Sequence, residues 1–328
     1  MNLGLCLPAP ADPTSFYRAL GVFGPLAKEH NINLITGNYW SWENVIQCDV
    51  LFVQRPFADE HRKVCEIARS LKVPIWLDYD DNLWNVPQSN SAYQLYMNTR
   101  AHANMRTMCR MADVVTVTTQ ELARQIQGAT VVPNAFNDYI WDMSELPRQN
   151  SISWRGSATH FEDMEGYIPQ IEYLARINSE WNWHFIGQPH WAITKGIIPP
   201  KRIALHQYCD SMFSYIETFR QVAPSIHIVT LQDSLFNKCK SNLAWVESTM
   251  CGAVTIAPDW EEWQGRGCVL YDSPITFYDA VKQAIVMGPD WRRQQLTVAR
   301  DYINFNLKLS HVNETRWEIL KRLAKKEK

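Results

Sequence analysis

The chain has 328 residues, a length that suits two domains better than one hydrophobic core. Its 46% hydrophobic and 20% charged residues indicate a globular protein, and a net charge of −2 excludes the global basic field that draws nucleic acid or anionic membrane. The eight cysteines form no CxxC pair, which argues against disulfides or a zinc site.

Two features that indicate a membrane or exported protein are not found in the sequence. No stretch offers about 18 consecutive apolar residues, so no membrane span is expected. The opening residues, MNLGLCLPAP, lack the basic region of a signal peptide. We therefore expect a cytoplasmic protein with reduced thiols.

The first half of the chain alternates between strand and helix patterns. Short apolar runs bounded by turn residues predict strands, and apolar residues spaced three and four apart predict helices. The expected strands are 2–7, 32–36, 49–54, 73–77, 113–117 and 130–132, and the expected helices are 15–30, 58–71, 92–111 and 120–127.

The alternation restarts after a polar stretch at 135–150, which we interpret as a linker. Two Rossmann-like, doubly wound α/β domains are predicted, with ligands at the carboxyl ends of the strands in a cleft between the domains. The expected strands are 151–155, 183–186, 203–206, 226–231, 253–257 and 268–271, and the expected helices are 163–177, 212–221, 238–251, 276–286, 291–305 and 311–324. The predicted parts are a first domain (1–134), a second domain (151–305) and a terminal helix (306–328).

The segment Phe236 to Trp260 carries the strongest ligand signal. Its predicted helix ends at Gly252, and Lys240 and Glu247 lie two turns apart, on one face. A cation at a helix start is unfavourable unless an anion binds there. The segment therefore predicts a ligand with an anionic end near Lys240 and hydroxyls near Glu247, and solvated surface charges are the alternative.

Two polar segments of the same half could contact that ligand. Arg155-Gly156-Ser157 follows a strand, where a glycine lets backbone N–H groups approach a phosphate and an arginine neutralises it. Gly187 closes the next strand. Asn237 and Ser241 flank the two lysines of the segment FNKCKS. An ordinary turn and a surface loop are the alternatives.

Three carboxylates, Asp78, Asp80 and Asp81, follow a predicted strand of the first half. Their mutual repulsion requires compensation by a metal, an arginine or substrate hydroxyls, unless they form a solvated, capped turn. The pattern also resembles the haloacid-dehalogenase phosphatase motif, but Asn82 stands where that motif has Thr or Val and the further motifs are not found. It resembles the metal-binding Asp-x-Asp of GT-A glycosyltransferases as well, but those have one nucleotide-binding domain near the N-terminus rather than two repeats. The histidines show no metal-ligand spacing, and His160, after the turn at Arg155, is the one candidate among them for catalysis.

Several segments together resemble retaining GT-B glycosyltransferases of the glycosyltransferase family 4 type. The second half carries ATVVPNAFN at 129–137, SWRGSATH at 153–160, FIG at 185–187 and FNKCKSNLAWVESTMCGAVTIAP at 236–258. The first half carries YRALGVFGPL, VQRPF and DYDDNLW, which resemble a subgroup common in phage and surface-polysaccharide loci.

The resemblance implies roles for the domains and for individual residues. The first domain would bind the acceptor, the second domain would bind the donor, and the terminal helix, 306–328, would cross back to the first domain. Glu247 matches the second glutamate of the family's Glu-x7-Glu motif and would hold the ribose hydroxyls of a nucleotide-sugar. Lys240 and Arg155 would neutralise the donor diphosphate. The first glutamate is replaced by Cys239, the usual glycine pair by Ala9-Pro10-Ala11-Asp12, and the Gly-x-Pro by Gly252-Ala253-Val254.

The sequence thus predicts a retaining glycosyltransferase that uses a UDP- or GDP-sugar, with no metal and no other cofactor. Asp78, Asp80 or Asp81 would orient or deprotonate an acceptor hydroxyl. The predicted acceptor is a saccharide, and a hydroxymethylated pyrimidine of phage DNA, bound by Arg100, Arg106 and Arg110, is the alternative. A phosphatase or an inactive nucleotide-sugar-binding protein remains the alternative from another class.

Overall fold

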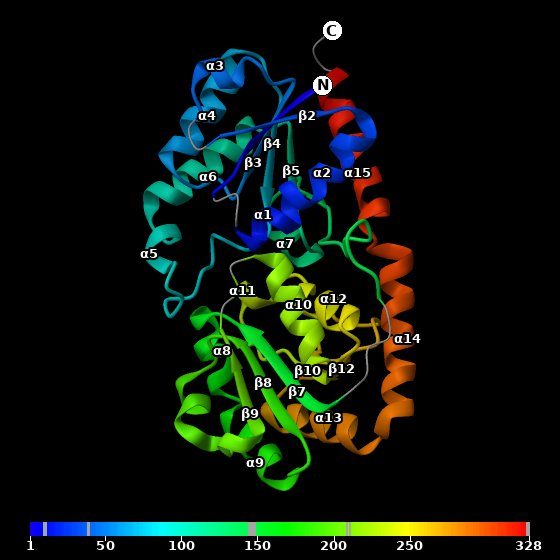
Figure 1. The fold of residues 1–328 in the computed structure, drawn as a ribbon. Coiled ribbons are helices and arrows are strands. Elements are labelled where there is room, and N and C mark those ends of the chain that lie inside the picture. Colours follow the sequence, from blue (N-terminus) through cyan, green and yellow to red (C-terminus); the bar gives the residue numbers. More distant parts are fainter. Residues whose placement is uncertain (9–11, 38–39, 144–148, 208, 210, 326–328) are drawn as a thin grey trace. The chain divides into compact units, whose positions relative to one another are not determined.

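The computed structural model describes all residues except 9–11, 38–39, 144–148, 208, 210 and 326–328 (Figure 1). Its contacts divide the chain into two compact units. Unit 1 comprises Met1–Ile140, Lys238–Ser241 and Leu307–Lys328, and unit 2 comprises Trp141–Asn237 and Asn242–Asn306.

Unit 1 is built on a six-stranded parallel sheet of order β2-β1-β3-β4-β5-β6 (Figure 1). Every residue of β3, β4 and β5 is buried, as expected for parallel strands covered on both faces. The strands are β1 (Asn2–Cys6), β2 (Asn33–Thr36), β3 (Val50–Gln54), β4 (Ile75–Tyr79), β5 (Val114–Val117) and β6 (Thr130–Val131), and the helices are α1 (Pro13–Arg18), α2 (Leu20–His30), α3 (Trp42–Val45), α4 (Asp59–Ser70), α5 (Tyr93–Tyr96), α6 (Thr99–Met111), α7 (Gln120–Gln125) and α15 (Leu309–Ala324).

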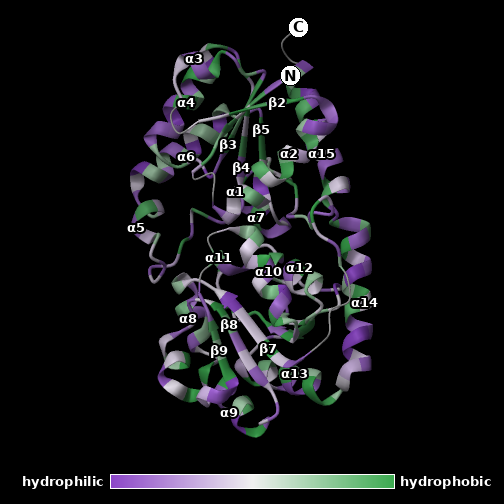
Figure 2. Cartoon of the chain, in the orientation of Figure 1, coloured by the Kyte–Doolittle hydropathy of each residue, from purple (hydrophilic) through white to green (hydrophobic). Residues whose placement is uncertain are grey.

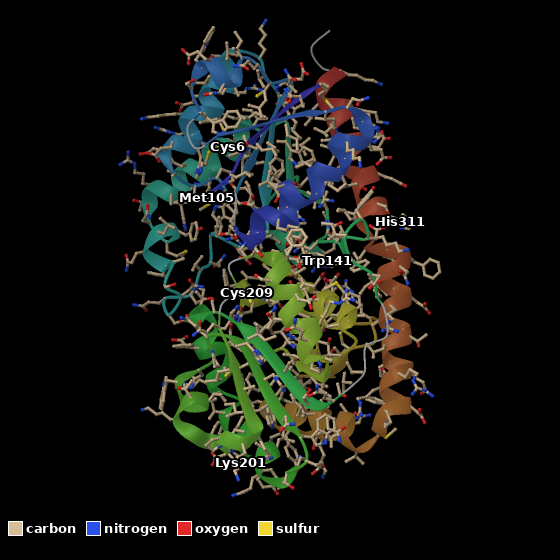
Figure 3. The ribbon with its side chains drawn as sticks, in the orientation of Figure 1. Cys6, Met105, Trp141, Lys201, Cys209 and His311 are labelled. Carbon is tan, nitrogen blue, oxygen red and sulfur yellow. The ribbon has the colours of Figure 1, made fainter. Side chains whose placement is uncertain are left out.

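The sheet of unit 1 separates two hydrophobic cores. Leu51 of β3 lies in one core with Cys6 and Met105, which are labelled in Figure 3. Phe52, the next residue, lies in the other core with Leu320 of α15. This alternation follows from the two-residue period of a strand. The chain's last helix packs on the same face as α2.

Unit 2 is built on a second six-stranded parallel sheet, of order β12-β11-β10-β7-β8-β9. In chain order this is the 3-2-1-4-5-6 arrangement of dinucleotide-binding folds, with its switch point between β7 and β10. The strands are β7 (Gln149–Gly156), β8 (Asn182–Gly187), β9 (Ile203–His206), β10 (Pro224–Ile228), β11 (Val254–Pro258) and β12 (Val269–Tyr271), and the helices are η1 (Ala158–His160), α8 (Phe161–Glu165), α9 (Ile168–Ile177), η2 (Ile193–Ile197), η3 (Pro200–Arg202), α10 (Met212–Val222), α11 (Leu235–Lys238), α12 (Leu243–Met250), α13 (Pro274–Val286) and α14 (Gly288–Asn306).

The predicted fold class, two Rossmann-like doubly wound α/β domains, is confirmed by these sheets. The predicted stop at Gly252 is also confirmed. Its φ of 77° is left-handed, and the N–H groups of Gly252 and Ala253 donate to the carbonyls of Thr249 and Ser248.

Local signals shortened several predicted elements. The predicted helix 238–251 is wrong over its first turn, because α11 ends at Lys238 and α12 begins only at Leu243. The predicted helix 92–111 is interrupted at Asn98, whose side chain accepts the N–H of Ala101 and thereby starts α6 afresh. Of the predicted linker 135–150, residues 149 and 150 belong to β7 and 144–148 lie outside the described residues.

The two C-terminal helices are amphipathic, with hydrophilic and hydrophobic patches in turn along α14 and α15 (Figure 2). Within the described residues, no helix of 18 residues or more is apolar enough to cross a bilayer.

Candidate functional site

In unit 2, an ion pair lies at the carboxyl end of β7, beside the switch point of the sheet. Arg155, near the end of β7, places its Nη2 atom 3.0 Å from Oε2 of Glu247 on α12. Tyr215 of α10 donates its hydroxyl to the same oxygen over 2.8 Å. Glu247 is only 3% exposed, so its carboxylate is buried and held by two other elements. Parallel sheets of this order bind ligands at this edge.

A buried histidine lies close to the same arginine. His227 of β10 pairs across the sheet with Ser153 of β7, and its Nδ1 lies 2.9 Å from the serine Oγ. Burial, together with the positive charge of Arg155, lowers the pKa of His227 to about 3. The imidazole is therefore neutral at physiological pH and does not compete with Arg155 for Glu247.

Side chains crowd the backbone at Gly156, the last residue of β7. A Cβ atom on Gly156 would lie 2.6 Å from the ring of Trp154 and 3.2 Å from His160. Gly156 pairs with Gly187 of β8, which has a φ of 100°. Ser157 exchanges a 2.6 Å hydrogen bond with Thr159. The glycine is thus required by local packing, whether or not a phosphate binds there.

His160 belongs to a second hydrogen-bonded group in unit 2. Its Nδ1 lies 2.8 Å from Oδ2 of Asp163. The other carboxylate oxygen of Asp163 accepts bonds from the Asn237 side chain at 2.6 Å and from the backbone of Gln232 at 3.1 Å. Two predicted residues, His160 and Asn237, are therefore joined by a carboxylate that the sequence analysis did not single out.

The segment carrying Lys240 groups with unit 1, whereas the sequence analysis placed it in the donor domain. Its residues accept hydrogen bonds from residues that follow strands β4, β5 and β6 of unit 1. The side chain of Asn82 donates to Cys239 Sγ over 3.4 Å, and Thr119 donates to the carbonyl of Cys239 over 2.9 Å. Asn134 donates to Ser241 Oγ over 2.8 Å. Lys240 thus stands on a docked loop rather than at a helix tip.

Cys239 occupies the position that matches the first glutamate of the Glu-x7-Glu motif. It is fully buried and belongs to the hydrophobic core of unit 1, together with Tyr79, Leu83 and Val117. Burial raises the pKa of its thiol to about 11. A carboxylate in this position would lose its hydration, so the structure gives a physical reason for the departure from the motif.

Asp78 is bound by groups of unit 1 on both carboxylate oxygens. Arg18 of α1 donates from Nε over 2.9 Å and from Nη2 over 2.6 Å, and Thr116 donates over 2.6 Å. Arg18 also donates to Asn134 and to the carbonyl of Val132. With an exposure of 2%, Asp78 has the environment of a structural ion pair.

Asp80 and Asp81 share a different arginine. Arg55, directly after β3, donates to both carboxylates, with Nη2 at 2.6 Å from Asp80 and 2.8 Å from Asp81. Its φ of 47° is left-handed, which is uncommon for an arginine. Burial raises the pKa of Asp81, and the charges of Arg55 and Lys240 offset part of that rise. Asp81 therefore binds a proton more readily than an exposed carboxylate.

The structure thus brings the predicted residues together in three groups: Arg155 with Glu247, His160 with Asn237, and Asp80 with Asp81. Within the described residues, no cluster of three or more histidine, cysteine or acidic side chains has the arrangement of a metal site. Sequence reasoning missed Tyr215 and Arg18 altogether. For Arg55 a signal existed, because it stands in the segment VQRPF next to a proline.

No protein-family model and no curated protein matches the sequence. Solved structures do match. The Anabaena HepE protein in complex with UDP-glucose has a TM-score of 0.67 at 12% identity, covering 98% of this chain and 100% of that one. A trehalose-6-phosphate structure from E. coli bound with UDP-2-fluoro glucose has a TM-score of 0.66 at 10% identity, covering 98% and 99%.

The S. aureus TarM protein matches with a TM-score of 0.61 at 11% identity, over 85% of this chain and 58% of TarM. These identities are too low to transfer an activity, but the TM-scores establish the fold. The chain has the GT-B fold, as predicted.

Proposed function

We propose that this protein is a glycosyltransferase that moves a sugar from a UDP- or GDP-sugar to an acceptor hydroxyl. The observation that carries the proposal is the match over 98% of the chain to GT-B structures that hold UDP-glucose or a fluorinated analogue. The pair of half-buried Arg155 and buried Glu247 at the carboxyl edge of β7 supports it, because ligands of such sheets bind at that edge.

On the donor side, we assign Glu247 to the ribose hydroxyls and Arg155 to the diphosphate. A buried carboxylate is a strong hydrogen-bond acceptor for a diol. Negative charge grows on the diphosphate as the anomeric C–O bond breaks, and a preorganised guanidinium stabilises it. Gly156, Ser157, Gly187, Asn237, Ser241 and Lys240 stay predicted donor contacts, and His160 stays a predicted catalytic residue.

On the acceptor side, we assign the acceptor hydroxyl to Asp81 rather than to Asp78. Both oxygens of Asp78 already accept bonds from Arg18 and Thr116. Asp81 has a raised pKa, which favours proton uptake. In the proposed step the acceptor oxygen bonds to the anomeric carbon, its proton passes to Asp81, and the nucleoside diphosphate leaves with the bonding electron pair.

The finer parts of the proposal are retention at the anomeric carbon, a saccharide acceptor and independence of metal. Retention is supported by the family 4 resemblance of the residues around Glu247. It is checked by the anomeric configuration of the product in NMR spectra. Arg106 and Arg110, which lie exposed on α6, leave modified DNA as the alternative acceptor. A steep fall of acceptor affinity with salt would favour DNA.

The first test is a thermal-shift screen of UDP, GDP, ADP and CMP, because a ligand bound only to the folded state raises the Tm. We expect UDP or GDP to stabilise the protein and the matching nucleotide-sugars to release UDP or GDP when acceptor saccharides are added. If neither UDP nor GDP stabilises the protein, the proposed function is wrong. Metal-dependent hydrolysis of an aryl phosphate would instead indicate a phosphatase.

A further inference from the structure

We propose that Tyr215 is a positioning residue that fixes the Glu247 carboxylate and thereby sets the preference for a ribonucleotide over a deoxyribonucleotide. The inference rests on the proposed function, because it needs Glu247 to receive the ribose hydroxyls. It adds a residue, from a helix that no sequence motif covered, to the recognition of the donor.

The geometry is that of a carboxylate held from two sides. The Tyr215 hydroxyl of α10 donates a hydrogen bond to Oε2 of Glu247 on α12 over 2.8 Å, and Nη2 of Arg155 on β7 forms an ion pair with the same oxygen at 3.0 Å. The terminal torsion of a glutamate is intrinsically broad. A hydrogen bond and an ion pair on one oxygen, from two separate elements, restrict that torsion and so orient the carboxylate.

An ionised carboxylate accepts hydrogen bonds at up to about four positions on its two oxygens, and Tyr215 occupies one position, on Oε2. The vicinal hydroxyls of a ribose can supply further donors in a defined direction. A 2′-deoxyribose supplies one donor fewer, so the affinity difference between the two nucleotides reports how well the carboxylate is oriented.

Tyrosine suits this role because it remains a donor. Burial, together with the negative charge of Glu247, raises the pKa of Tyr215 well above its ordinary value. The hydroxyl therefore stays protonated at neutral pH. The ring packs beside Phe219, with centroids 6.1 Å apart, so a phenylalanine in its place would keep this packing and lose only the hydrogen bond.

The experiment measures Kd by calorimetry for UDP and GDP and for their 2′-deoxy counterparts. The variants are Tyr215→Phe, Glu247→Gln and, as a matched control, Tyr167→Phe. The Tyr167 hydroxyl also makes a buried bond in unit 2, to the carbonyl of Leu231 over 3.0 Å. The control therefore removes a similar hydroxyl away from Glu247, and melting curves establish that each variant is folded.

The wild type is expected to prefer the ribonucleotide by about tenfold, the usual effect of one hydrogen bond to a charged group. Tyr215→Phe and Glu247→Gln should each bring this ratio close to one, while Tyr167→Phe keeps it. The inference is overturned if the ribonucleotide binds and Tyr215→Phe keeps the full preference, or if Glu247→Gln keeps it. If neither UDP nor GDP binds the wild type, the proposed function fails together with the inference.

Discussion

Replacing His227 with asparagine is expected to make unit 2 less sensitive to acid. His227 is 1% exposed, and burial, with the nearby charge of Arg155, lowers its pKa to about 3. In the unfolded chain its pKa is about 6.5. As the pH falls below 6.5, the unfolded state takes up a proton that the folded state cannot accept. His227 therefore costs stability progressively between pH 6.5 and pH 3.

The size of the effect follows from the two pKa values. One pKa unit corresponds to about 1.4 kcal/mol, so His227 alone should remove about 3 kcal/mol of unfolding free energy between pH 7 and pH 4. An asparagine can keep a hydrogen bond to Ser153 but does not titrate. The His227→Asn variant should therefore lose about 3 kcal/mol less than the wild type over this range, whatever its stability at pH 7.

The assay is urea unfolding at several pH values between 7 and 4, with hydrogen exchange in peptides from β7 and β10 to report on unit 2. The control is His311→Asn, because His311 lies exposed near the start of α15 (Figure 3). Its profile should run parallel to that of the wild type. A parallel profile for His227→Asn as well would refute the assignment of a neutral, buried imidazole beside Arg155.

Substitutions at three further positions and the removal of metal ions by EDTA test the remaining predictions. Lys240→Ala should weaken the thermal stabilisation by UDP or GDP and lower turnover at least about tenfold, as expected for a lost contact to a diphosphate; unchanged values would remove Lys240 from the donor site. Asp78→Asn should destabilise the protein by about 3–5 kcal/mol in urea unfolding, because Arg18 would be left buried without its partner; near-native stability would contradict the structural role. Cys239→Glu should lower the Tm much more than Cys239→Ala, since it buries a carboxylate in the core of unit 1; equal effects would argue that position 239 is open to solvent. Turnover in EDTA should be undiminished, and a strict requirement for Mn²⁺ would favour the metal-binding interpretation of Asp78 and Asp80.

The two glutamate positions of the motif, 239 and 247, differ in how much the sequence alone could predict about them. Glu247 could be selected from the sequence because of its seven-residue spacing from Lys240 and its match to the motif, which are signals carried by nearby residues. The neighbourhood of position 239 could not be selected in this way. Its contacts come from Asn82 and Thr119, more than a hundred residues away in the chain.

The partners of the carboxylates of unit 1 could not be predicted from neighbouring residues either. The sequence showed three acidic side chains at a strand end and required that something compensate their charges. It did not show that two different arginines do so, Arg18 for one carboxylate and Arg55 for the other two. Asp78 therefore forms a buried structural pair with Arg18, whereas Arg55 holds the carboxylates that include Asp81, which we assign to the acceptor hydroxyl.

By itself, the sequence determined the alternation of strands and helices, the two-domain fold class and the edges of the sheets where polar residues gather. These follow from apolar periodicity and turn residues, which act over a few positions of the chain. Only the tertiary structure decided that Lys240 belongs to a loop docked on unit 1 and that Tyr215 and Arg155 share one oxygen of Glu247. Such partnerships depend on which elements the sheet order makes neighbours, and no local pattern encodes that order.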